Sequence, residues 1–409
     1  MPAPSPVLLA LVLSLAAAIS LGITRFAYGL LLPIMREDLG WSYLLAGAMN
    51  TANALGYLAG ALSAPLLLRR LGVGRTLLIG AIGSTVFMAL SGFFRTAEWL
   101  LLQRLLAGVT SAWLFVVGGW LTAQWLTRDG QRSGWLLGLY YGGTGWGIAV
   151  SALTVPAVLS GGGSWPHAWW ALALVCALAS AALWPLTRDR PGLTPGQHAA
   201  AQAAGPPPAA EPEPGGQAQA VPWRQGLPML AAYGCFGIGY IGYMTFVIAL
   251  MREQGVSADS RTLFYTALGL AVVASARIWA GVLDRFREGQ AMALLNALLG
   301  LATLLPALTA QTPVLLASGV LFGAVFLSVV ASTTAWVRHN LPAHLWAQGI
   351  TGFTVVFAVG QVVGPSAVGL IADEAAGLAG GLLASACVLW IGSAVALLQT
   401  KTRPCQHRA

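Results

Sequence analysis

Apolar runs of about 20 residues recur along almost the whole chain, and each could cross a hydrocarbon core of roughly 30 Å as a helix. Twelve of them divide the 409 residues, near positions 7–35, 43–68, 76–94, 98–126, 135–159, 168–187, 227–250, 262–283, 290–309, 313–337, 345–371 and 376–399. In lipid, a helix satisfies its own backbone hydrogen bonds. The pattern therefore predicts an all-α integral membrane protein with 12 transmembrane helices.

The scarcity of charge supports the same class. Asp, Glu, Lys and Arg make up 8% of the chain and apolar residues 57%, whereas an ordinary soluble domain carries roughly 25% charged residues. The net charge of +8 comes from basic residues spread thinly between apolar runs, without the basic patch that a nucleic-acid partner requires. We therefore expect a lipid bilayer as the partner and no nucleic acid.

The basic residues also predict the orientation. If both termini are cytoplasmic, the inward segments hold fourteen of the 21 Lys and Arg residues, the outward segments four and the spans three. This bias follows the positive-inside rule. The first run has no basic residue before it and continues for a full span, so we interpret it as a helix and not as a signal peptide.

A polar, Pro-rich stretch at 188–224 interrupts the spans and divides them six and six. We expect an N-terminal six-helix bundle at 1–187, a cytoplasmic linker at 188–224, and a second six-helix bundle with a short cytoplasmic tail at 225–409. A shift of 215 residues aligns 22–28 with 237–243, with Arg25 opposite Tyr240. This weak repeat predicts two pseudo-symmetric halves.

Two six-helix halves with a cytoplasmic linker resemble the major facilitator superfamily (MFS), and the resemblance covers nearly the whole chain. The loop between helices two and three of that superfamily usually reads Gly-x-x-x-Asp-Arg-x-Gly-Arg. The matching stretch here keeps Arg70, Gly72 and Arg75 but has Arg69 in place of the acid. The equivalent loop of the second half keeps the acid, as Asp284 followed by Arg285.

The fourth span carries Arg104 and Gly108, which resemble the superfamily's Arg-x-x-x-Gly motif. The resemblance implies that these loop and span motifs serve conformational change or gating. The fifth span lacks the Gly-Pro pair that marks many drug/proton antiporters. The stretches 22–33 and 360–365 are similar to a bacterial branch known as YbfB-like, which implies a multi-pass protein of the bacterial cytoplasmic (inner) membrane.

Acidic residues are absent from the interior of the spans. All 13 Asp and Glu residues and all five His residues fall in loops or at span edges. Proton-driven transporters generally use an intramembrane carboxylate or His. Neither group is available here inside the predicted spans.

Three arginines do lie inside spans. Arg25 is about 15 Å from the outer end of its helix at 1.5 Å per residue, whereas Arg104 and Arg277 lie near 10 Å from an edge, where snorkelling or pairing with a loop is an alternative. A bound anion is the natural counter-charge for Arg25, because a guanidinium fork suits a carboxylate or phosphate. The alternative is that Arg25 bonds oxygens of neighbouring helices.

Polar and aromatic residues in the spans complete the candidate solute site. Tyr28 lies one turn from Arg25 on the same face of a continuous helix, and the repeat places Tyr240 and Tyr243 in the opposite half. Asn53 belongs to a polar stripe with Asn50 and Tyr57 at helical spacing, and Gln361 stands beside Gly360. Packing between helices is the alternative role for each of them.

These features predict a secondary active or facilitative transporter of a small organic anion, monocarboxylate-like, that works by alternating access around a midplane site with Arg25. The alternatives are an exporter of amphiphilic or drug-like compounds and a non-transporting membrane sensor. No nucleotide-binding loop, metal-ligand set or catalytic constellation is recognisable. We therefore expect no enzymatic activity, no cofactor and no metal, and we favour a monomer.

Overall fold

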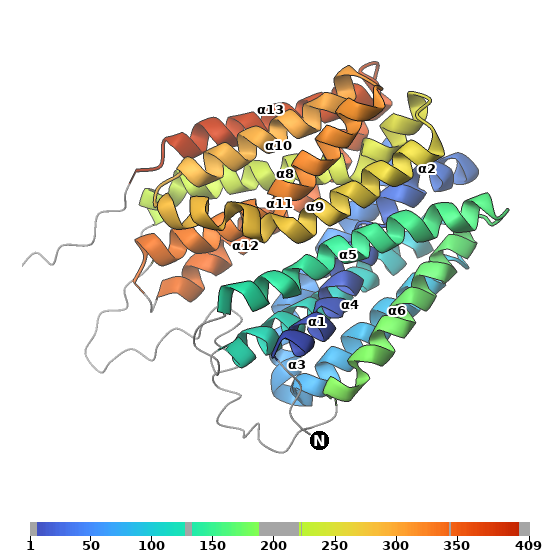
Figure 1. The fold of residues 1–409 in the computed structure, drawn as a ribbon. Coiled ribbons are helices and arrows are strands. Elements are labelled where there is room, and N and C mark those ends of the chain that lie inside the picture. Colours follow the sequence, from blue (N-terminus) through green and yellow to red (C-terminus); the bar gives the residue numbers. More distant parts are fainter. Residues whose placement is uncertain (1–5, 127–132, 188–220, 222, 343–344, 401–409) are drawn as a thin grey trace, which may run out of the picture.

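The computed structural model describes residues 6–126, 133–187, 221, 223–342 and 345–400. Within these ranges every regular element is a helix, which confirms the predicted all-α class (Figure 1). The first half contains α1 (Pro6–Ala17), the π-helix η1 (Ala18–Ile23), α2 (Tyr28–Leu39), α3 (Tyr43–Ser91), α4 (Ala97–Leu126), α5 (Ser133–Ser160) and α6 (Trp165–Thr187). The second half contains α8 (Trp223–Glu253), α9 (Ala258–Arg285), α10 (Gln290–Leu308), α11 (Thr312–Asn340), α12 (Trp346–Asp373) and α13 (Gly377–Leu397).

Ten of the described helices are long and apolar enough to cross a membrane, or eleven if the bent α9 counts as one span. Helix α3 is 49 residues long, which exceeds the length of one span. Gly72 interrupts it with φ +81°, a left-handed conformation that glycine adopts without a steric penalty. The predicted number of twelve spans is reached if α3 is divided at Gly72.

The two halves meet along two pairs of long helices. Helix α5 lies along α9, where the green and yellow helices adjoin in Figure 1, and α3 lies along α12. The backbones approach closely between α5 and α9, because a Cβ atom added to Gly145 would lie 2.3 Å from the carbonyl oxygen of Gly269. Small residues at such positions allow this approach in membrane helix pairs.

Polar contacts join the halves at one end of the molecule, the end that the charge distribution predicts to be extracellular. The carboxylate of Asp373, at the end of α12, accepts hydrogen bonds from the backbone N–H groups of Tyr43 (2.7 Å) and Leu44 (2.8 Å). These N–H groups belong to the first turn of α3, where the helix dipole favours negative charge. Arg252 of α8 and Glu37 of α2 form an ion pair of 2.6 Å. The halves are therefore held together at this end.

The predicted linker at 188–224 lies almost entirely outside the described residues, and so does the tail beyond position 400. Helix α8 begins at Trp223, close to the predicted start of the second bundle at 225. The division at 1–187, 188–224 and 225–409 stays a prediction.

Candidate functional site

The first span is irregular in its middle. The predicted helix over 7–35 is present as one helical run, Val7–Leu39, but the π-helix η1 and the turn residues 24–27 lie between α1 and α2, with helical dihedral angles at Thr24 and Ala27. We call residues 18–27 the irregular segment. Short π-helical segments occur frequently at functional sites. A Cβ atom on Gly22 would lie 2.5 Å from the carbonyl oxygen of Thr144 in α5, so η1 packs directly on the α5 backbone. Arg25 lies in the irregular segment, buried inside the bundle.

Arg104 of α4 donates hydrogen bonds to carbonyl groups of the irregular segment. Its guanidinium donates to the oxygen of Thr24 at 2.7 Å and, more weakly, to that of Arg25 at 3.5 Å. It also donates to the Asn50 side-chain oxygen at 2.9 Å. Arg104 is 3% exposed, so the alternative of snorkelling to the membrane edge is wrong. Irregular backbone at membrane depth needs such internal partners.

The second half contributes to the same region. The hydroxyl of Tyr265 in α9 donates to the oxygen of Phe26 at 2.8 Å. The Asn50 side-chain nitrogen donates to the hydroxyl of Thr245 in α8 at 2.7 Å. The irregular segment thus lies at the interface of the halves, and its backbone accepts hydrogen bonds from both halves.

Arg25 itself has little protein compensation for its charge. The side chain is 3% exposed, and one terminal nitrogen, Nη2, has no hydrogen-bond partner. Its guanidinium carbon lies 5.6 Å from the ring centre of Tyr57, within the range of a cation–π contact. Arg25 and Arg104 are the only buried charged side chains among the described residues, and no described carboxylate is buried. The interior of the described fold therefore carries uncompensated positive charge.

Two predicted site residues of the second half lie beside this charge. Tyr240 of α8 is close enough to Arg25 for an electrostatic interaction, as the repeat that aligned the two positions suggested. The side-chain amide of Gln361 in α12 donates to the hydroxyl of Tyr240. Arg25, Tyr240 and Gln361 are thus brought together from three helical segments of both halves.

The other three predicted residues make bonds elsewhere. The Tyr28 hydroxyl donates to the Ala46 oxygen at 2.8 Å, and its ring lies under Arg104, not Arg25. The assumption of regular α-helical spacing, which placed Tyr28 and Arg25 on one face, fails in the irregular segment. The Tyr243 hydroxyl shares a 2.7 Å hydrogen bond with Ser318, and the Asn53 amide donates to the Arg104 oxygen at 3.0 Å.

Sequence reasoning missed several rings near Arg25. Tyr57 was noted only as part of a polar stripe, and Phe26, Phe326 and Phe357 were not recognised. A usable signal was present in α8, where aromatic residues recur at 233, 236, 240 and 243, the spacing of one helix face. The partners on α11 and α12 follow from tertiary packing.

The motif residues have identifiable places. A Cβ atom on Gly108 would lie 2.2 Å from the Asn53 oxygen, so this glycine permits α4 to pack against α3. Gly72 forms the turn inside α3, flanked by the exposed residues Arg69, Arg70 and Arg75. Asp284 and Arg285 are exposed at the end of α9, and Arg277 is exposed in the same helix. Their role in gating stays a prediction.

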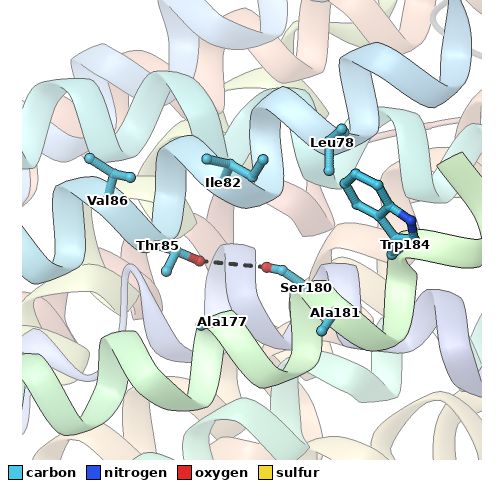
Figure 2. A pocket seen from close by; sticks show the side chains of 8 residues that line it. All are labelled: Leu78, Ile82, Thr85, Val86, Ala177, Ser180, Ala181 and Trp184. Atoms are coloured by element: carbon cyan, nitrogen blue, oxygen red, sulfur yellow. Dashed lines mark hydrogen bonds between the residues drawn. The ribbon is translucent and has the colours of Figure 1, made fainter.

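A groove of about 220 Å³ lies between the second segment of α3 and α6 (Figure 2). Its walls are apolar except for the hydroxyls of Thr85 and Ser180, which lie 3.5 Å apart and also bond carbonyl oxygens of their own helices. Ile82 and Trp184 are nearly half exposed at its rim. The groove contains none of the predicted solute-binding residues, and its chemistry matches the lipid-facing surface.

Comparisons with known proteins agree with this architecture. The crystal structure of a mutant of the nucleoside transporter NupG matches with a TM-score of 0.67 at 13% sequence identity, over 97% of this chain and 98% of that one. This likeness shows that the two proteins share a fold. No curated protein matches significantly. Residues 17–397 match the sequence family described as "Uncharacterised MFS-type transporter YbfB", and the chain belongs to this family. The resemblance noted in the sequence is thereby confirmed.

Proposed function

We propose that this transporter carries a small organic anion, monocarboxylate-like, and that Arg25 binds its anionic group. The observation that carries the proposal is the buried Arg25 guanidinium, which has one nitrogen without a partner and, among the described residues, no buried carboxylate near it. An unpaired charge at membrane depth is costly, and such residues commonly mark solute pathways. A bound anion would supply the missing counter-charge.

The two buried arginines have different roles in this proposal. Arg104 donates hydrogen bonds to the Asn50 side chain and to the Thr24 backbone oxygen in the irregular segment. Nη2 of Arg25, which has no hydrogen-bond partner, would donate to a carboxylate, which accepts paired N–H bonds from a guanidinium fork. A second positive charge nearby, on Arg104, raises the preference of the site for an anion.

Transport would follow from rocking of the two halves about this site, in a cytoplasmic membrane with both termini inside. Arg25 and its turn belong to the first half, and Tyr240, Gln361 and Tyr265 belong to the second. The absence of buried carboxylates among the described residues suits anion exchange, facilitated diffusion or symport in which the solute carries the proton. Each mode moves the anion without a protein carboxylate that takes up a proton.

The test is counterflow in proteoliposomes with labelled pyruvate, lactate, acetate and 4-hydroxybenzoate. We expect at least one acid to accumulate with the wild type, and Arg25→Gln to lower its uptake by a factor of about 10 to 100, because a hydrogen bond to a charged group contributes roughly 1.5–3 kcal/mol. Arg25→Lys keeps the charge but loses the fork, so an intermediate rate is expected. Wild-type uptake in Arg25→Gln would refute the site. Transport of a neutral or cationic compound that collapses with the pH gradient would favour the amphiphile exporter.

A further inference from the structure

The rings around Tyr240 form an unusual series in the second half. Tyr240 lies nearly parallel to Phe236 (centres 4.8 Å apart, planes at 20°), to Phe357 (5.6 Å, 19°) and to Phe326 (6.1 Å, 7°). Phe236 and Phe357 are also parallel within 8°. We call these four residues the parallel ring series. Their separations are those of offset-stacked aromatic pairs.

The first half presents rings of a different kind to Arg25. Tyr57 contacts Phe115 at 57°, and Phe115 contacts Tyr140 and Tyr141 at 44° and 43°. Tilted rings fill space as ordinary helix packing does. Near-parallel rings, in contrast, offer faces of one orientation, to which a further flat group can be added by stacking.

Contacts connect the charge of Arg25 to the parallel ring series. Tyr240 interacts electrostatically with Arg25, and the neighbouring Phe26 meets Phe326 edge-on at 5.9 Å. The Gln361 amide donates a hydrogen bond to the Tyr240 hydroxyl. Tyr240 is thus the member of the series that interacts with Arg25, and a ligand that neutralises Arg25 would approach these rings there.

We propose that the solute is an aromatic carboxylate, a planar ring that bears one carboxylate group. The carboxylate would bind Arg25, and the ring would stack against the parallel ring series beside Tyr240. This inference rests on the proposed function, because it names the organic part of the anion that Arg25 binds. An aliphatic acid of equal charge would use Arg25 alone and gain nothing from the orientation of the rings.

Binding to the purified full-length protein, measured by isothermal titration calorimetry, separates the two contributions with three probes. Benzoate has a planar ring and a charge, cyclohexanecarboxylate has the charge on a puckered ring of the same carbon skeleton, and benzamide has the planar ring without the charge. We expect benzoate to bind roughly three- to tenfold more tightly than cyclohexanecarboxylate, the range of an aromatic pair contribution. Benzamide should bind more weakly than either acid.

Variants assign each preference to a residue. Tyr240→Leu should reduce the preference for benzoate over cyclohexanecarboxylate to less than about twofold and keep the preference for benzoate over benzamide. Arg25→Gln should reduce the preference for benzoate over benzamide and keep the preference for benzoate over cyclohexanecarboxylate. Tyr240→Phe keeps the ring and should keep the ring preference. Tyr141→Leu, which changes a tilted and 38% exposed ring of the first half, is the matched control and should alter neither preference.

The outcomes distinguish the two proposals. Equal binding of benzoate and cyclohexanecarboxylate, both lost in Arg25→Gln, would overturn the aromatic solute and leave the anion transporter intact. Binding of both acids that is unchanged in Arg25→Gln, or no binding of any carboxylate, would overturn the anion site and the ring inference with it. If Tyr240→Leu fails to fold, Phe357→Leu removes a neighbouring ring of the same series and is expected to weaken the ring preference.

Discussion

The guanidinium of Arg104 donates a 2.7 Å hydrogen bond to the carbonyl oxygen of Thr24, the residue directly before Arg25. One buried arginine therefore stabilises the backbone that carries the other. Arg104 supplies this hydrogen bond to the irregular segment, whereas Nη2 of Arg25 has no hydrogen-bond partner. We therefore expect Arg104 to stabilise the fold and Arg25 not to stabilise it, and this difference can be measured.

Arg104→Gln should destabilise the protein. The shorter side chain cannot reach the oxygens of both Thr24 and Asn50, and each buried polar group left unsatisfied costs roughly 1–3 kcal/mol. We expect a lower unfolding midpoint in detergent, measured by the change of intrinsic tryptophan fluorescence on heating. Arg104→Lys, which retains a donor and the charge, should lie between Arg104→Gln and the wild type. If Arg104→Gln had the same unfolding midpoint as the wild type, the stability of the irregular segment would not depend on this arginine.

Arg25→Gln should leave the unfolding midpoint at or above the wild-type value. This substitution removes a buried guanidinium that lacks full compensation, and the burial of an unpaired charge is unfavourable. The same heating experiment, run beside Arg104→Gln, measures the contrast. A loss as large as that of Arg104→Gln would assign Arg25 a structural role and contradict the proposed site.

A solute that binds Arg25 should stabilise the folded protein. At a concentration tenfold above its dissociation constant, a ligand adds about 1.4 kcal/mol to the free energy of unfolding. We expect the best acid from the transport screen to raise the midpoint of the wild type and to have no such effect on Arg25→Gln. Potassium chloride at equal ionic strength is the control for a general salt effect. A shift of the same size in Arg25→Gln would place the binding elsewhere.

Asp373→Asn should weaken the closed end of the molecule. The Asp373 carboxylate accepts two backbone N–H bonds from the first turn of α3 across the interface of the halves, and a neutral amide interacts less favourably with that helix terminus. Spin labels at Gly40 and Glu374 in a cysteine-free background can report the separation by double electron–electron resonance. We expect a larger population at long distance in Asp373→Asn. Thr312→Ala, at the same end but outside this contact, is the control, and identical distributions would contradict the role of Asp373.

Gly145→Ala should disturb the contact of α5 with α9. The added Cβ atom would lie 2.3 Å from the carbonyl oxygen of Gly269 in the other half, so the two backbones must separate. We expect a transport rate that differs severalfold from the wild type in counterflow, because this contact lies between the halves that rock. Gly281→Ala is the matched control in α9, since a Cβ atom there meets nothing within 4 Å. Equal rates for all three proteins would exclude this contact from the transport cycle.

The sequence was sufficient to predict the all-α class and the positions of the spans. Apolar runs of span length fix where helices form in lipid, because the backbone must satisfy its own hydrogen bonds there. The absence of acidic residues from the interior of the spans could also be seen in the sequence, and the described structure contains no buried carboxylate. Arg25 could be singled out from its depth alone, and the repeat pointed to Tyr240 as its counterpart.

Only the tertiary structure decided how these residues are used. The Tyr28 ring lies at Arg104 and the Arg25 guanidinium lies at Tyr57, and no local signal for the irregular segment is recognisable in an apolar run that favours a regular α-helix. Likewise, the faces of Phe326 and Phe357 become parallel to Tyr240 only when α8, α11 and α12 pack together. Hydropathy is a property of each segment, and the sequence therefore determined the spans. Partners and ring orientations are properties of helix pairs far apart in the chain, so they were decided by packing.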